Sequence, residues 1–302
     1  MRLQILDNQV GPHTFRMVKP SDFNIFKALP SLIPFITTID TTQKVIFETE
    51  IDDDETATKR TIAKTPDDIC FNWEDADCII RPLPHSSHLV SITPRKSGKN
   101  YWMECNDNFR QCFIHLPACR TETPAPENET NFVLNNAFNA ARHHTLLMHA
   151  SVVATVTGKG YLFLGKSGTG KSTHTGLWLQ QFSDCHLLND DNPIVHVDSL
   201  GKQATVFGSP WSGKTPCYRK ESMTVGAFVR LEQAPQNEIE QERAAHAFAT
   251  LLPSCSCLKQ NKEIYNAIVT TVTELATLAP VYHLKCLPDR EATELCRKTV
   301  EG

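Results

Sequence analysis

The chain has 302 residues, of which 40% are hydrophobic and 21% are charged, and its formal net charge at pH 7 is -4. These values are ordinary for a folded protein, and the length suffices for one large domain or, as we expect, two average ones. Proteins that wrap nucleic acid gather Lys and Arg on one face, whereas this chain has an isoelectric point near 6.3. Nucleic acid is therefore excluded as a partner.

A membrane is also excluded as a partner, because no apolar run approaches the ~18 residues that a membrane helix needs. Residues 1–15 lack the basic and then apolar pattern of a secretory signal, so we expect a cytoplasmic location. The chain has eleven cysteines, of which only Cys255 and Cys257 lie close together. This pattern completes neither a zinc site nor a disulfide framework, and it predicts reduced, mostly buried thiols.

Residues 1–119 are expected to form an N-terminal β-rich domain. Short apolar runs at 44–47, 78–80 and 89–92 are separated by polar stretches rich in turn residues, which is typical of strands. The segment between Ile92 and Tyr101 contains Pro, Gly and Asn and predicts a hairpin. The acidic run 52–55 is expected in a solvated loop rather than in a metal site.

A linker is expected at residues 120–130, where two prolines stand among charged and small polar residues that cannot bury a core. Residues 131–302 then form the second domain. Apolar residues between Phe132 and Ala141 have helical spacing and predict a helix that runs to about His144. Two apolar runs, 146–154 and 161–164, are joined by a turn at 157–160 and predict a hairpin.

The remaining pattern of the second domain alternates strands and helices, which predicts an α/β fold. Strands are expected at 187–189, 193–197, 204–207, 225–231 and 281–286. Helices are expected at 244–252, at 263–278 and from Pro288 to about Lys298.

The strongest functional signal is the segment GKSGTGKS at residues 165–172, which matches the P-loop (Walker A) pattern G-x-x-x-x-G-K-[ST]. A strand precedes the segment and a helix follows it, so backbone N–H groups and the helix N-terminus should face phosphates. We expect Lys171 to reach the β- and γ-phosphates and Ser172 to ligate Mg²⁺. The sequence therefore predicts binding of ATP with Mg²⁺. The other loop residues expected to contact the nucleotide are Gly165, Ser167, Gly168, Thr169, Gly170 and Thr173.

Two adjacent acids, Asp190 and Asp191, follow an apolar run that ends like a strand. Ligands of α/β sheets bind at the carboxyl ends of strands, so both acids should lie near the P-loop. In phosphoryl transfer one carboxylate fixes Mg²⁺ and another accepts the proton of the attacking hydroxyl, and we assign the metal to Asp190 and the proton to Asp191. The alternative is a solvated turn before Pro193.

These residues together resemble the C-terminal catalytic domain of HPr kinase/phosphorylase, whose P-loop fold is shared with phosphoenolpyruvate carboxykinase. The likeness depends on His149 at the start of a hairpin, the loop at 165–173, the pair Asp190 and Asp191, and a second glycine-containing loop after the next hairpin. An antiparallel hairpin leads into the P-loop here, unlike the first parallel strand of Ras-like proteins. The resemblance implies a mixed sheet of the HPr kinase and carboxykinase type.

The resemblance also implies roles for individual residues. It places His149 at the active site and makes Asp191 the general base, and with Lys171 of the P-loop these are the residues expected to act in catalysis. The alternative for His149 is a structural role on an apolar strand. The second loop, GSPWSGKT at 208–215, departs from HPr kinases, which carry an acidic residue and an arginine before it, where this chain has Thr205 to Gly208. The segment looks more like a divergent HPr kinase-related group in which a GSPWSGK-type loop recurs, so recognition of HPr itself is not expected.

Three residues in and after the second loop are candidates to contact the substrate. A loop with glycine at both ends can bring ammonium groups close to anions, so Lys214 and Arg219 would meet phosphate or an acidic substrate, and Trp211 would form a wall of the pocket. The alternative is that Trp211 packs in the core and Lys214 is solvated. His174, one turn into the P-loop helix, is expected at the surface.

The leading hypothesis is an ATP-dependent kinase that transfers the γ-phosphoryl group to a hydroxyl of a small molecule or protein. One alternative is a nucleotide-binding regulatory module without chemistry, although the paired acids argue against it. A carboxykinase acting on oxaloacetate is a second alternative, but the chain is short and lacks the substrate-binding arginine motif of those enzymes. The acceptor is not identified by the sequence, and a homo-oligomer is compatible with it.

Overall fold

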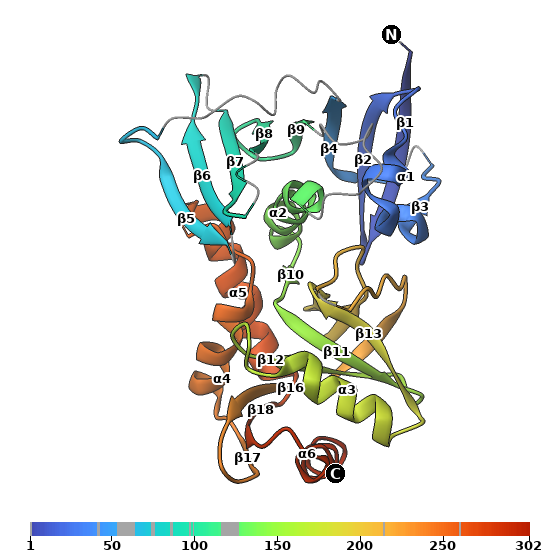
Figure 1. The fold of residues 1–302 in the computed structure, drawn as a ribbon, viewed down its shortest axis with the longest axis vertical. Coiled ribbons are helices and arrows are strands. Elements are labelled where there is room, and N and C mark those ends of the chain that lie inside the picture. The colour runs from blue at the N-terminus through green and yellow to red at the C-terminus, as the bar shows by residue number, and fades with distance from the viewer. Residues whose placement is uncertain are drawn as a thin grey trace. The chain divides into compact units, whose positions relative to one another are not determined.

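A computed structural model of the chain describes residues 2–40, 43–52, 64–73, 76–84, 87–96, 98, 100–115, 127–213, 215–259 and 261–302. The chain divides into two compact units, which we call the N-terminal unit (Met1–Gln9 and His13–Asn139) and the C-terminal unit (Val10–Pro12 and Ala140–Gly302). Each unit contains one large mixed sheet, and strands outnumber helices, so the protein is a mixed α/β structure (Figure 1).

The sheet of the N-terminal unit has the strand order β3-β1-β2-β4-β9-β8-β7-β6-β5. Strand β4 pairs in parallel with β2 and with β9, whereas consecutive strands from β5 to β9 pair antiparallel. The expected β-rich character is confirmed, as is the hairpin before Tyr101. The strands are β1 (Leu3–Val10), β2 (His13–Pro20), β3 (Ile36–Thr37), β4 (Val45–Asp52), β5 (Ile69–Trp73), β6 (Ala76–Pro82), β7 (His88–Pro94), β8 (Tyr101–Cys105) and β9 (Gln111–His115).

Helices of this unit are short except for the last. Helix α1 (Ile25–Ala28) is followed by a 3-10 helix (Pro30–Phe35), and α2 (Glu127–Ala141) ends the unit. The Phe138 ring on α2 contacts Phe109 edge to face at 5.1 Å. The helix predicted from Phe132 onward is thus confirmed, and it also includes residues 127–130 of the expected linker. Residues 120–126 and 53–55, the latter in the acidic run, lie outside the described residues.

The C-terminal unit has the strand order β10-β14-β15-β16-β12-β11-β13, with β18 pairing with β16 and with β17. Every strand predicted here from residue 187 onward is confirmed, whereas the short β17 was not expected. The strands are β10 (Thr145–Leu147), β11 (Ala150–Thr155), β12 (Lys159–Leu164), β13 (Cys185–Asp191), β14 (Ile194–Asp198), β15 (Gln203–Phe207), β16 (Ser222–Gln233), β17 (Glu238–Gln241) and β18 (Val281–Cys286).

Strands β11 and β12 form the expected antiparallel hairpin before the glycine-rich loop. Ala150 pairs with Leu164 and Ala154 with Gly160, and all six residues of β11 are buried because β12 and β13 flank it. On its other side β12 pairs in parallel with β16. The loop therefore leaves an interior strand of the sheet, whose neighbours fix the position of its last residue.

One strand prediction was wrong in detail. The apolar run 146–154 was expected to be a single strand, but it breaks at Met148 and His149. Met148 forms an isolated antiparallel bridge with Cys255, and the His149 amide donates to the carbonyl of Ser254 at 2.7 Å. These contacts come from a distant part of the chain, and they place His149 between β10 and β11.

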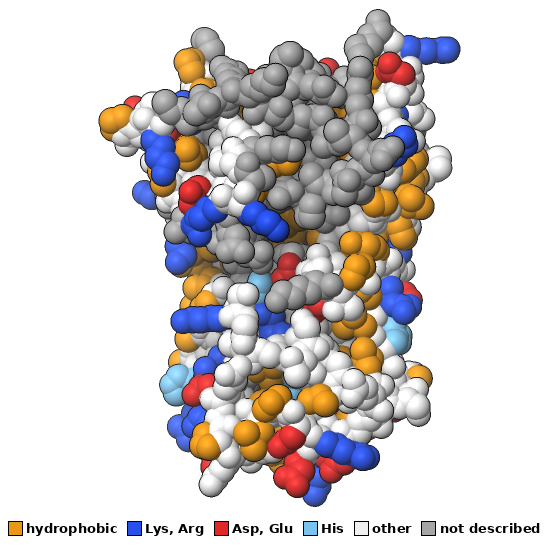
Figure 2. Space-filling model, viewed as in Figure 1, with side chains coloured by type: hydrophobic (Ala, Val, Ile, Leu, Met, Phe, Trp, Pro, Cys, Tyr) orange, Lys and Arg blue, Asp and Glu red, His pale blue; other side chains and the backbone are white. Residues whose placement is uncertain are grey.

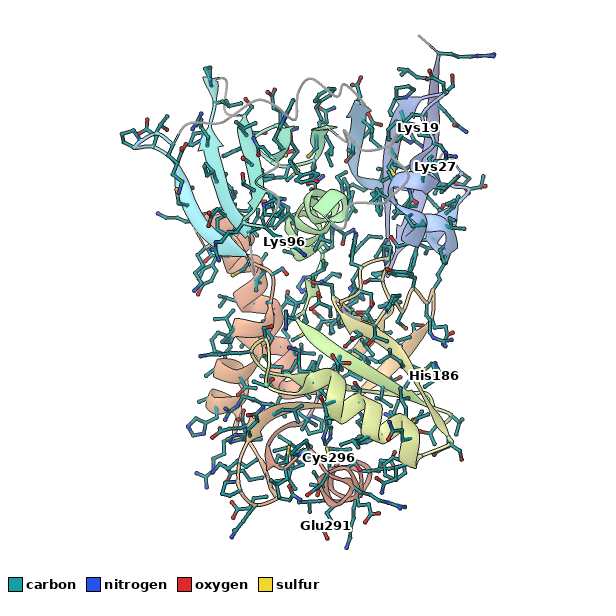
Figure 3. All side chains as sticks on the ribbon, viewed as in Figure 1. Lys19, Lys27, Lys96, His186, Glu291 and Cys296 are labelled. Atoms are coloured by element: carbon teal, nitrogen blue, oxygen red, sulfur yellow. The ribbon has the colours of Figure 1, made fainter. Side chains whose placement is uncertain are left out.

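Four α-helices and a short 3-10 helix (Leu252–Ser254) lie in the described part of the C-terminal unit, and the predicted α-helices are confirmed within a few residues at each end. They are α3 (Lys171–Gln181), α4 (Ala244–Leu251), α5 (Lys262–Leu278) and α6 (Arg290–Glu301). Helices α3 and α6 contact each other and cover a core in which Trp178, Phe163 and Cys296 are fully buried. Figure 3 labels Cys296 on α6.

The expectation that His174 lies at the surface is wrong, because its side chain is only 3% exposed. Its ring packs edge to face on Phe163 at 4.8 Å, and its Nε2 accepts a hydrogen bond from the Trp178 indole at 3.1 Å. Burial lowers the pKa of His174 to about 4. His174 is therefore a neutral core residue that orients Trp178, which excludes it from surface or proton-transfer roles.

The cysteines in the described part of the chain form no disulfide, and most of them are buried, as expected. No helix among the described residues is both long and apolar enough to cross a membrane. On the face drawn in Figure 2, Lys and Arg side chains are scattered among other residues rather than gathered in a stripe.

Candidate phosphate-binding and catalytic site

The glycine-rich loop occupies residues 165–170, between the end of β12 and the start of α3. Gly170 is the N-cap residue of α3 and has φ +102°, a left-handed conformation that favours glycine. The first backbone N–H groups of a helix have no intrahelical acceptor and form the positive end of its dipole. The loop and the first turn of α3 thus form a surface suited to an anion such as phosphate.

Lys171, the first residue of α3, turns its ammonium back over the loop. The Nζ atom donates to the Gly165 carbonyl at 3.0 Å and contacts the Lys166 carbonyl at 3.4 Å. It also lies 2.6 Å from Nε2 of His149. The ammonium is therefore held within the loop and beside an imidazole.

His149 lies between Lys171 and Asp191. An ammonium can only donate hydrogen bonds, so Nε2 of His149 accepts from Lys171 and the ring proton of the neutral tautomer is on Nδ1. That nitrogen lies 3.3 Å from Oδ1 of Asp191. The structure thus brings together the three residues that the sequence assigned to catalysis, as a chain of contacts from ammonium to imidazole to carboxylate.

Asp191 has an unusual backbone and an unusual carboxyl group. Its φ of +136° lies in the region that favours glycine, and its Oδ2 accepts a hydrogen bond from the side-chain nitrogen Nδ2 of Asn192 at 2.8 Å. Burial, the largest cause, raises the pKa of Asp191 to about 6, while the charge of Lys171 opposes the rise and that of Asp190 adds to it. A strained residue with a shifted pKa is typical of a functional site.

Asp190 contacts Ser172, the residue that follows Lys171 on α3. The Ser172 hydroxyl donates to the Asp190 carboxylate at 3.1 and 3.3 Å, and Asp190 is only 4% exposed. Hydroxyl and carboxylate oxygens are hard ligands of the kind that Mg²⁺ prefers, and one or two protein ligands suffice when phosphates and water complete the octahedron. These two residues fit a Mg²⁺ site, although the described residues contain no group of three or more His, Cys, Asp or Glu arranged to hold a metal.

Asn189 anchors the backbone around the two acids. It is fully buried. Its Oδ1 accepts a hydrogen bond from the backbone nitrogen of Asn192 at 3.0 Å, and its Nδ2 donates to the backbone carbonyl of Trp211 at 2.9 Å. The Ser209 hydroxyl in turn donates to the Asn192 carbonyl at 2.7 Å. These bonds hold the turn after β13 against the second loop and support the strained conformation of Asp191.

The second glycine-containing loop lies directly against the acids. Ser212 and Asp191 form a backbone bridge, the Ser212 hydroxyl donates to the Asp190 carbonyl at 3.2 Å, and the Gly213 amide donates to the same carbonyl. A Cβ at Gly213 would approach both Asp190 and Asp191 to 3.1 Å, so a side chain here would press on the turn. The second loop therefore lies against the turn that carries the two acids.

The three substrate candidates have different positions. Trp211 is 2% exposed and packs within the fold, and Arg219 pairs with Glu221 at 3.2 Å. Neither side chain makes a described contact with His149 or Asp191. Lys214 lies outside the described residues.

Sequence reasoning missed Asn189, Asn192 and Ser209 as parts of the site. Each was visible as a polar residue next to a predicted functional segment, and Asn189 interrupts an apolar strand immediately before the two acids. A buried side-chain amide in such a place must form hydrogen bonds. The position of Asn189 in an apolar strand could therefore have indicated that it holds the neighbouring segments together.

We expect Asp191→Asn to stabilise the protein at neutral pH. The pKa of Asp191 rises from 3.8 to about 6, so the folded state binds this proton more tightly than the unfolded state does, and stability falls as pH rises through that range. The wild type should lose on the order of 3 kcal/mol relative to the variant, since one pKa unit is about 1.4 kcal/mol. Urea unfolding of both proteins at a series of pH values checks this. If the free energy of unfolding changed with pH in the same way in both proteins, the pKa of Asp191 would not be raised by burial.

No protein-family model matches the chain, and no curated protein is similar enough in sequence to count as a match.

Proposed function

We propose that the protein is an ATP-dependent phosphotransferase that moves the γ-phosphoryl group of ATP to a hydroxyl group of a small molecule or a protein. The observation that supports this most is that two carboxylates lie near the glycine-rich loop in different positions. The carboxylate of Asp190 accepts a hydrogen bond from Ser172, and the carboxylate of Asp191 lies beside His149. A binding module without chemistry needs only the first of these carboxylates.

In this proposal the loop and Lys171 bind the triphosphate. Lys171 exchanges its contacts with the loop carbonyls for phosphate oxygens, since a hydrogen bond from an ammonium to an anionic oxygen is stronger than one to a neutral carbonyl. Ser172 and Asp190 hold Mg²⁺, which when bound neutralises charge on the phosphates.

Asp191 serves as the group that takes the proton of the acceptor hydroxyl. Its pKa near 6 is high for an aspartate, which makes it a stronger base while it remains mostly ionised at neutral pH. The Asn189 and Ser209 hydrogen bonds fix its position, which preserves alignment with the transferred group. Turnover should therefore rise with pH through an apparent pKa near 6.

The order of strands around the glycine-rich loop supports the proposal of a kinase. A phosphate loop that follows an antiparallel hairpin in a mixed sheet is the arrangement expected for an HPr kinase-like domain and differs from that of Ras-like proteins. The second loop, which contacts both acids, would form the side of the site nearest the acceptor.

The test of the proposal is transfer of label from γ-labelled ATP to pools of amino acids, sugars and peptides in the presence of Mg²⁺. We expect one pool to take up label with wild-type protein and not with Asp191→Asn. Oxaloacetate is the comparison substrate for carboxykinase chemistry. Tight binding of ATP without transfer to any pool would favour the regulatory-module alternative instead.

A further inference from the structure

His149 presents a nucleophilic nitrogen to the place where the terminal phosphate is expected. Lys171 donates to Nε2, so this nitrogen carries a lone pair directed at the ammonium 2.6 Å away. The opposite ring nitrogen faces the Asp191 carboxylate at 3.3 Å, which orients the ring and stabilises positive charge on it. A carboxylate behind an imidazole is the arrangement that makes the distal nitrogen a better nucleophile.

The same ammonium is the group expected to bind the γ-phosphate. A phosphate oxygen bound to Nζ of Lys171 would lie at about 2.8 Å from it, which is comparable to the distance at which Nε2 of His149 already lies. The imidazole nitrogen Nε2 and the terminal phosphate would thus lie next to each other, because both are close to the ammonium of Lys171. His149 is half-buried, with its side chain 34% exposed, so its ring is partly shielded from competing water.

We propose that His149 is a phosphorylation site, whose Nε2 accepts the γ-phosphoryl group of ATP before that group reaches an acceptor hydroxyl. This inference rests on the nucleotide binding proposed above, but it goes beyond direct transfer to a hydroxyl. The protein would form a phosphohistidine in the absence of any acceptor.

The first step balances as a substitution at phosphorus. The ammonium of Lys171 first leaves Nε2 for a phosphate oxygen, which releases the lone pair on that nitrogen. The Nε2 lone pair then forms a new N–P bond, and the bond from the γ-phosphorus to the bridging oxygen breaks, with its electron pair leaving on ADP. The proton on Nδ1 stays in place, and the positive charge that develops on the ring is stabilised by the carboxylate of Asp191.

The second step returns the imidazole to its starting state. The acceptor oxygen forms a bond to phosphorus, the N–P bond breaks, and its electron pair returns to Nε2. The hydroxyl proton passes to the carboxylate of Asp191. Asp191 therefore acts in both steps, first by stabilising the ring and then as the proton acceptor.

The chain contains a matched control for this chemistry. His186 on β13 also pairs with a carboxylate, with Nε2 2.9 Å from Oε2 of Glu221, and it has a similar exposure of 37% (Figure 3). No described contact joins His186 to the glycine-rich loop. A general reactivity of histidine–carboxylate pairs would label both residues, whereas the proposal labels only His149.

The experiment uses the full chain with γ-labelled ATP and Mg²⁺ but without acceptor, followed by an alkaline quench. Wild type and His186→Gln should both carry label that is stable in alkali and lost in acid, because the N–P bond of phosphohistidine has this behaviour. In His149→Gln the label should fall to background. Mass spectrometry at neutral to alkaline pH should place the phosphoryl group on His149 of the wild type.

MgATP titration of the same preparations separates this proposal from the proposed function. Wild-type protein that binds MgATP and transfers phosphate to an acceptor, but shows no acid-labile label, would overturn the phosphohistidine and leave the kinase intact. Label that survives acid, or label retained in His149→Gln, would also overturn it. Failure to bind MgATP would remove both proposals. The mapping on wild-type protein decides the question even if His149→Gln does not fold.

Discussion

Lys171→Ala is expected to weaken MgATP binding by about 1.5 to 3 kcal/mol, which is roughly a tenfold to hundredfold rise in Kd. The ammonium of Lys171 is held in the loop by the Gly165 carbonyl and by His149, so it is already positioned where phosphates are expected. Charge-assisted hydrogen bonds in such a partly desolvated place are among the strong ones. Isothermal titration calorimetry with MgATP measures the change.

The control for this prediction is Lys166→Ala, which removes an exposed lysine from the same loop. Its backbone carbonyl accepts from Lys171 and Thr169, but these bonds do not require the Lys166 side chain. We expect its affinity to change far less. Unchanged affinity in a folded Lys171→Ala protein would remove the phosphate-loop interpretation.

Asp191→Asn is expected to abolish most phosphoryl transfer, with a loss on the order of 10² to 10⁴ in rate, while MgATP binding stays nearly intact. The carboxylate contacts His149 and Asn192 rather than the glycine-rich loop, so its charge contributes little to holding the nucleotide. Its loss removes both the proton acceptor and the stabilisation of charge on the imidazole. Transfer assays paired with nucleotide titration measure the two effects separately.

Asp190→Asn provides the comparison, because the neighbouring acid contacts Ser172 instead of His149. It should weaken the Mg²⁺ dependence of nucleotide binding as well as turnover. Wild-type turnover in Asp191→Asn, or the same response to Mg²⁺ in both variants, would show that the division of roles between the two acids is wrong.

The parts of the site that could be predicted from sequence are those encoded locally. The strand, loop and helix around residues 165–172 depend on glycine spacing and on apolar runs a few residues away, and these patterns remain recognisable without tertiary context. The placement of Asp190 and Asp191 at the end of a strand followed in the same way. The resemblance to a known kinase family added the role of His149.

The parts that could not be predicted depend on distant contacts. The break at Met148 and His149 is formed by residues 254 and 255, about a hundred positions along the chain. His174 was expected at the surface because a polar residue on a short helix carries no local sign of burial. It is buried because Trp178 and the core beneath α3 and α6 enclose that side of the helix.

Thermal unfolding of the wild type with and without MgATP is the direct test of whether the loop at residues 165–172 binds a nucleoside triphosphate. A ligand that binds only the folded state at about 100 times its Kd stabilises that state by about 2.7 kcal/mol. We predict a clear rise in Tm with MgATP, a smaller rise with MgADP, none with adenosine, and a much smaller rise with the same MgATP concentration in Lys171→Ala. An equal Tm with and without saturating MgATP, in protein that unfolds cooperatively, would contradict the account.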